Sequence, residues 1–254
     1  VGIEQFLAEG ISGSVSYTHA STDNLTRFVN RNDAALGSPW SSGLPNGNGI
    51  NQLVTVESTA RSRYNGITVG LQRTSDPDVN FQINYTLSWD KSDDDNERDP
   101  FSFRYADVTN FAPEYNWSDR DQRHRVNGWI LARLPADFIA NGRVSFYSAQ
   151  PVSENCVAGG RAVTPADRIC ADGSILPRNT LRKENEFFSL DIRLSRAVRF
   201  GQGELELIGE VFNVTNADNF LDASSAGLLF NFDGTLRSGL GNPRQFQVGA
   251  KYRF

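Results

Sequence analysis

Long apolar runs are missing from this chain of 254 residues. No stretch approaches the roughly 18 to 20 apolar residues that a membrane-spanning helix needs. The mean hydropathy of -0.43 and the 22% of charged residues are those of an ordinary soluble domain. They do not exclude a membrane β-barrel, because only every second residue of a barrel strand contacts lipid.

Methionine is absent as well. Val1 is therefore not expected to be a translation start, and no signal peptide precedes it, which predicts a processed product or a fragment. The net charge is -5 and the pI is near 5.1. This acidic balance gives no reason to expect a nucleic acid partner, which would favour a basic stripe.

Cysteine and histidine are scarce, with two residues of each. Cys156 and Cys170 lie in a segment rich in Gly, Pro and polar residues, which favours a loop disulfide in an oxidising compartment over a metal site. His19 and His124 lie in different expected strands, and no G-x-S-x-G, H-E-x-x-H or P-loop pattern occurs. We therefore expect no catalytic residues, no cofactor and no enzymatic activity.

The clearest pattern is in the last ten residues, 245–254, where polar and apolar residues alternate. Successive strand side chains point to opposite faces, so such a strand separates a wet surface from an apolar one. Ten residues is also the span that a tilted strand needs to cross a bilayer. A last strand of this kind resembles the C-terminal signature of bacterial outer-membrane barrels. Its apolar face consists of Phe246, Val248, Ala250, Tyr252 and Phe254.

Similar alternation along the chain predicts about nine strands. We expect them at 1–7, 11–20, 64–73, 81–89, 123–134, 142–148, 187–200, 204–212 and 245–254, although Trp129 and Leu131 break the alternation of their segment. Short turns at 8–10, 75–80, 135–141 and 201–203 alternate with long connections at 21–62, 90–122, 150–186 and 213–243. Such long connections are uncommon in compact soluble domains. Outer-membrane barrels have short periplasmic turns and long extracellular loops.

The expected fold is therefore all-β, a transmembrane antiparallel β-barrel with its long loops outside the cell and its C-terminus in the periplasm. Nine strands are a difficulty, because bacterial barrels of one chain have an even number. An open sheet in lipid would also leave unpaired edge groups at several kcal/mol each. We therefore expect residues 1–254 to be the C-terminal part of a larger barrel.

Six segments give a more specific resemblance. In chain order they are ARSRYNGITVGLQR (60–73), NFQINYTLSWDKSDDD (80–95), SDRDQRHRVNGW (118–129), FFSLDIRLSRAVRF (187–200), LELIGEVFNVTNADNF (205–220) and GNPRQFQVGAKYRF (241–254). Together they resemble the C-terminal barrel half of TonB-dependent outer-membrane receptors. The resemblance is to the Oar-like group, which has a carboxypeptidase-regulatory-like N-terminal domain.

The resemblance implies a 22-stranded barrel, occluded by an N-terminal plug, that imports a bound ligand with energy delivered through TonB. This chain lacks the plug, the TonB-contacting segment and the earlier strands, so the expected function belongs to the parent protein. The implied partners are outer-membrane lipid, the inner-membrane TonB complex through the missing N-terminal region, the barrel assembly machinery through the C-terminal strand, and an unknown extracellular ligand.

Two other classes of protein share part of the pattern. An outer-membrane surface or adhesion barrel without transport would have the same strands and loops, but no plug upstream. A soluble all-β binding domain would alternate in the same way, but its apolar faces would pack into a core and its connections would be short.

Two groups of charged residues call for an interpretation. An acidic run contains Asp93, Asp94, Asp95 and Asp99, whose carboxylates are candidate calcium ligands. It lacks EF-hand spacing, so we expect a solvated loop.

A second group consists of Asp119, Arg120, Asp121, Arg123, His124 and Arg125. We expect it to form an ion-pair network at the barrel wall, because charge pairs keep such residues buried.

Aromatic residues lie near the ends of several expected strands. They are Tyr17, Trp89, Trp129, Tyr147 and Tyr252. We expect them to form girdles at the membrane interfaces rather than a carbohydrate platform.

Overall fold

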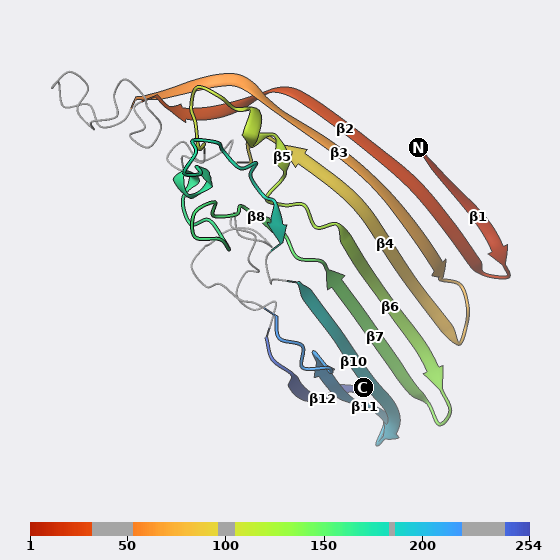
Figure 1. Ribbon diagram of the computed structural model, residues 1–254. Coiled ribbons are helices and arrows are strands. Elements are labelled where there is room, and N and C mark those ends of the chain that lie inside the picture. Colours follow the sequence, from red (N-terminus) through yellow and green to blue (C-terminus); the bar gives the residue numbers. More distant parts are fainter. Residues whose placement is uncertain (32–52, 96–104, 183–185, 220–241) are drawn as a thin grey trace.

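The computed structural model describes residues 1–31, 53–95, 105–182, 186–219 and 242–254. Nine long strands form one curved antiparallel sheet in the order β1-β2-β3-β4-β6-β7-β10-β11-β12 (Figure 1). Their bounds are β1 Gly2–Ala8, β2 Ile11–Asn30, β3 Val54–Arg73, β4 Val79–Ser92, β6 His124–Leu134, β7 Phe138–Tyr147, β10 Phe187–Phe200, β11 Gly203–Phe212 and β12 Gln245–Arg253. The nine expected strands are confirmed.

The connections contain short elements that the sequence pattern does not indicate, because each is only two to four residues long. They are β5 (Asn116–Trp117), which pairs with the end of β4, β8 (Pro151–Val152), which pairs with β9 (Leu181–Arg182), and the 3-10 turns η3 (Ala112–Glu114) and η4 (Pro165–Arg168). No helix within the described ranges is long and apolar enough to cross a membrane.

Strands β2 and β3 extend about ten residues further than expected. Their pairing is regular up to Thr22, shifts register before Leu25, and continues to the pair Asn30 and Val54. Asn24 has a φ of 61° at this irregularity. A bulge changes which side chains face the same side, so the regular alternation along the sequence ends there. The expected loop at 21–62 is therefore wrong at both of its ends.

The turn between β6 and β7 is also tighter than expected. Leu134 pairs directly with Phe138, so only three residues connect the strands, and Ala136 and Asp137 both have a φ of 61°. The β6 strand is regular through Trp129 and Leu131 in spite of their side chains.

All four tight turns lie at one end of the sheet, and all four long connections leave from the other (Figure 1). We call these the turn end and the loop end. This arrangement follows from hairpin pairing of neighbouring strands, because each long connection then starts and returns on the same side.

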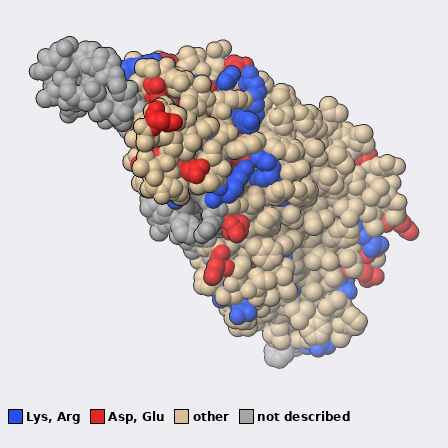
Figure 2. Space-filling model, in the orientation of Figure 1, with Lys and Arg blue, Asp and Glu red and all other residues tan. Residues whose placement is uncertain are grey.

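The register places apolar residues of all nine strands on one face, which we call the apolar face. One cross-strand row runs from β1 to β10 through Ile3, Val15, Val69, Tyr85, Val126, Phe146 and Phe188. A second runs from β4 to β12 through Val79, Ala132, Ala140, Leu194, Gly209 and Val248. On this face Lys, Arg, Asp and Glu gather toward the two ends of the strands and leave an uncharged band between them (Figure 2).

The opposite face is polar, and we call it the polar face. Its row from β1 to β10 consists of Glu4, Ser14, Gly70, Asn84, Asn127, Ser145 and Ser189. Between β10, β11 and β12 it carries ion pairs, in which Arg193 lies 3.4 Å from Glu206 and Arg253 lies 3.5 Å from Glu204.

Large apolar side chains remain exposed on the apolar face. The exposed fraction is 53% for Val15, 51% for Leu207 and 88% for Val248. Among the described residues the buried apolar cluster contains only Val29, Tyr105 and Val108, with Phe111 packed against it. A continuous apolar surface of this kind marks an interaction with a membrane or another protein.

We expect Ile130→Arg to destabilise the sheet in a bilayer. Ile130 lies on the apolar face of β6, and a cation near the bilayer midplane costs about 2–4 kcal/mol. The matched control is Leu131→Arg, which places the same charge on the polar face one residue away. Its cost should stay within about 1 kcal/mol. Urea unfolding in phospholipid vesicles measures both, and equal costs would contradict the assignment of the faces.

Candidate functional site

Two connections pack together at the loop end of the sheet, residues 105–122 and 150–182, and we call them the cap. Arg178 joins them to β4, because its guanidinium donates to the Ser92 carbonyl at 2.6 Å and to the Asp95 carboxylate at 2.9 Å. Its backbone N–H donates to the Pro113 carbonyl at 3.0 Å. Asn179 donates from its amide to the Trp117 carbonyl and the Asp119 carboxylate, each at 2.7 Å. One short stretch thus holds the two connections together.

Buried ion pairs hold the cap in place. Arg168 pairs with Glu114, and both side chains are almost fully buried. Arg27, which is 1% exposed, reaches from β2 to Asp93 at 3.0 Å. Its guanidinium also lies 4.4 Å from the centre of the Phe111 ring. Buried charges are tolerated only when they are paired in good geometry, so these pairs fix the cap in one arrangement.

The acidic run was expected to be a solvated loop, which is wrong for Asp93 and Asp94, because both are buried. Its members have different partners. Asp93 pairs with Arg27, Asp94 accepts a hydrogen bond from the Tyr105 hydroxyl at 2.6 Å, and Asp95 accepts from Ser118 at 2.9 Å. Burial and the negative charge of Asp94 raise the pKa of Tyr105.

Within the described ranges, no three His, Cys, Asp or Glu residues are grouped so that they could hold a metal ion. Asp99 lies outside those ranges. The aspartates of the described run serve as acceptors for arginine, tyrosine and serine.

Of the ion-pair network expected for the charged group at 119–125, the structure shows one pair within the group, between Asp121 and Arg123. This carboxylate is fully buried and lies 3.2 Å from Arg123 and 2.6 Å from Arg182. No local pattern in the sequence indicates Arg182 as a partner, because it lies 61 positions away from Asp121. His124 lies in β6 and shares a hydrogen bond of 2.8 Å between its Nδ1 atom and the hydroxyl of Tyr85.

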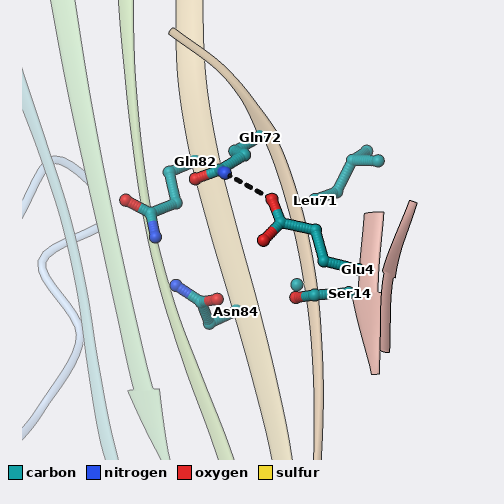
Figure 3. A pocket seen from close by; sticks show the side chains of 7 residues that line it. Glu4, Ser14, Leu71, Gln72, Gln82 and Asn84 are labelled. Atoms are coloured by element: carbon teal, nitrogen blue, oxygen red, sulfur yellow. Dashed lines mark hydrogen bonds between the residues drawn. The ribbon is translucent and has the colours of Figure 1, made fainter. Parts of the chain in front are cut away.

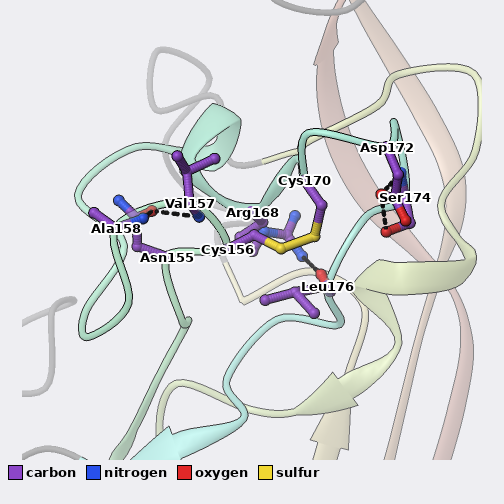
Figure 4. The surroundings of a disulfide bond; sticks show 9 residues. All are labelled: Asn155, Cys156, Val157, Ala158, Arg168, Cys170, Asp172, Ser174 and Leu176. Atoms are coloured by element: carbon purple, nitrogen blue, oxygen red, sulfur yellow. Dashed lines mark hydrogen bonds between the residues drawn. A yellow bond between two sulfur atoms is a disulfide. The ribbon is translucent and has the colours of Figure 1, made fainter.

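The two cysteines form a disulfide within the cap (Figure 4). Their Cα atoms are 5.1 Å apart, and the bond closes the segment that contains η4. Asn155, next to Cys156, accepts hydrogen bonds from the backbone N–H groups of Val157 and Ala158 at 3.0 and 2.8 Å. The disulfide and these turns give the outer part of the cap local order.

A small hollow lies on the polar face (Figure 3). Its volume is about 200 Å³, and it is lined by Glu4, Ser14, Gly70, Leu71, Gln72, Gln82 and Asn84. Gly70 leaves the space open, because a Cβ atom there would lie 2.6 Å from the Ser14 hydroxyl and 2.9 Å from the Asn84 amide oxygen. The lining offers amides, a hydroxyl and one carboxylate, which suit a polar group.

Three of the five aromatic residues expected in the girdles lie on the face that the girdles require. Tyr17, Trp89 and Tyr252 lie on the apolar face. Trp129 and Tyr147 lie on the polar face, where Trp129 donates to Gln82 at 3.4 Å and Tyr147 to Asn127 at 2.7 Å. The girdle assignment was wrong for these two, because their neighbours Ile130 and Phe146 occupy the apolar face.

Comparison with protein families gives one match: the outer membrane beta barrel domain matches residues 1–159. No curated protein sequence matches this chain.

Several solved outer-membrane proteins have a similar fold. The outer membrane transporter YddB from Escherichia coli has a TM-score of 0.57 at 11% identity, over 98% of this chain and 31% of that one. The ferripyoverdine receptor of Pseudomonas aeruginosa has a TM-score of 0.55 at 12% identity, over 98% and 26%. The ferric-catecholate import receptor Fiu from E. coli has a TM-score of 0.50 at 14% identity, over 97% and 26%. This chain thus spans between a quarter and a third of their length, and the likeness concerns the fold.

Glu114→Ala should loosen the cap, because it leaves the buried Arg168 guanidinium without its carboxylate. Breaking a buried pair in this way costs about 3–5 kcal/mol. Limited proteolysis of the membrane-embedded protein should then cleave within residues 105–182 faster than in the parent. The control is Glu204→Ala, which removes the exposed pair with Arg253 and should change cleavage little, since exposed pairs contribute about 0–1 kcal/mol.

Proposed function

This chain belongs to the outer membrane beta barrel domain family, and from this we propose that it forms part of the barrel of an outer-membrane receptor that imports a ligand with energy supplied through TonB. The observation that carries the proposal is the separation of the two faces over nine neighbouring strands. In a closed barrel the apolar face contacts lipid and the polar face lines the lumen. The role is non-enzymatic, and the ligand binds from outside the cell.

The two edges of the sheet support a larger barrel. Within the described residues, β1 pairs only with β2, and β12 pairs only with β11. Unpaired backbone groups at such edges are costly in lipid, so further strands must cover them. We propose that residues 1–254 are the C-terminal portion of a 22-stranded barrel whose plug and earlier strands belong to the rest of the protein, as in the Oar-like group that the sequence resembles.

Import, rather than surface attachment alone, is supported by the polar face. The hollow beside Gly70 and the ion pairs of Arg193 and Arg253 would line a wide polar lumen in a large barrel. The fold likeness to a transporter and two receptors points the same way. The second candidate is a surface or adhesion barrel without transport. The ion-paired cap favours this candidate, because such a cap offers a fixed outer surface for contacts.

We further propose that the loop end faces outside and the turn end faces the periplasm. The disulfide between Cys156 and Cys170 supports this orientation, because disulfides persist at oxidising cell surfaces. The partners are then outer-membrane lipid, the barrel assembly machinery at β12 with Phe254, and the TonB complex through regions beyond this chain.

An epitope inserted between Gly159 and Gly160 should be accessible to antibody on intact cells. Both glycines lie in an exposed turn of the cap with φ near 70°. The same epitope inserted between Ala136 and Asp137, in a tight turn at the other end, should react only after the outer membrane is permeabilised. The reverse pattern would overturn the orientation.

The import proposal is tested by the reading frame upstream of Val1. We expect a signal peptide, a plug-like domain and about thirteen further alternating strands, the number that completes a 22-stranded barrel. A signal peptide running directly into Val1 would exclude a plug and leave the surface barrel as the function.

A further inference from the structure

We propose that a basic belt at the loop end of the apolar face binds the phosphates of lipid headgroups in the outer leaflet of the membrane. The belt consists of Arg61, Arg63, Lys91 and Arg123. The inference rests on the proposed function, because it takes the apolar face as the lipid contact and the loop end as the outer side.

The register places Arg63 and Lys91 directly beyond the apolar band, and contacts with Trp89 and Trp117 place Arg123 beside them. Trp89 of β4 pairs with Asn65 of β3, and the next pair on the same face is Lys91 with Arg63. Arg61 follows on β3, where its carbonyl accepts a hydrogen bond from the Asp93 N–H at 3.2 Å. Lys and Arg side chains gather over the end of β4 and the beginning of β6, beside the uncharged band (Figure 2). Phosphates of lipid headgroups lie at this depth, just outside the hydrocarbon layer.

Aromatic rings position these cations at the interface. The Lys91 ammonium lies 4.6 Å from the centre of the Trp117 ring, and the Arg123 guanidinium lies 4.4 Å from the same ring. Arg123 is also 5.6 Å from the centre of the Trp89 ring. Tryptophan is enriched at the boundary between membrane and water, so the rings mark the depth at which the cations lie. The Lys91 ammonium, which has no ion pair within the described residues, can donate N–H groups to a phosphate oxygen.

The carboxylates near the belt compensate its charge only in part. Asp93 lies 3.7 Å from Arg61, but it also pairs with the buried Arg27. Asp121 pairs with both Arg123 and Arg182. Arg63 is paired with Asp23 at 2.8 Å, and Lys91 has no ion pair within the described part of the chain. The belt therefore carries excess positive charge, which an anionic headgroup would balance.

Binding of lipid A to the purified full-length protein in detergent tests the proposal. Native mass spectrometry compares lipid A that carries both phosphates with dephosphorylated lipid A. The parent protein should prefer the phosphorylated form. The double variant Arg63→Gln, Lys91→Gln should bind it roughly tenfold to thirtyfold more weakly, since each basic residue near an anionic surface contributes about a fivefold change. Raised salt should weaken binding by the parent in the same direction.

The matched control is Arg73→Gln, Arg196→Gln, which removes two charges from the same face at the turn end. It should bind like the parent. Lys91→Glu is a second variant, because it reverses one charge without breaking an ion pair in the described structure. It should weaken binding of lipid A at least as much as the roughly fivefold change expected for removal of one charge. Heat-dependent gel mobility checks that each variant is folded.

Equal binding by the two double variants, or equal binding of the two forms of lipid A, would overturn the proposal. The measurement in detergent does not depend on orientation or on import. The epitope and upstream-sequence experiments test those separately, so failure of the lipid site is distinguishable from failure of the proposed function.

Discussion

The register of nine neighbouring strands is the constraint on which the rest of the structure depends. Because side chains alternate between faces, a slip of one residue would move every apolar residue of a strand to the polar face. The three-residue connection from Leu134 to Phe138 and the turn from Phe200 to Gly203 hold the register at the turn end. Rows that continue from Ile3 to Phe188 and from Val79 to Val248 are possible only if all of these registers agree.

This constraint also explains why the buried apolar cluster is so small. In a soluble sheet the apolar face would cover a core, but here it points outward, and side chains such as Val248 remain exposed. The free energy that lipid contact provides takes the place of core packing. Within the described residues, buried apolar packing is concentrated at the loop end, where Val29 of β2 packs against Tyr105 and Val108 of the cap.

The cap uses a different kind of interaction from the sheet. Its order comes from buried charges, in which Arg168, Arg178 and Arg182 of the second connection reach Glu114, Asp95 and Asp121. These pairs join three segments that are far apart in the sequence, so the cap depends on the sheet holding its ends in place. The basic belt lies at the junction of the two, where the apolar band ends and the charged network begins.

Local pattern in the sequence determined the number of strands, the position of the turns and the identity of the apolar face, because a period of two residues is a property of each segment alone. It did not determine the full length of β2 and β3, since the irregularity at Asn24 interrupts the alternation. Nor did it determine the face on which Trp129 lies, because an aromatic residue fits either a membrane interface or a lumen. The distant partners of Asp121 and Glu114 were decided only by the tertiary structure: Arg182 and Arg168 lie 61 and 54 positions away, and no local periodicity links residues at such distances.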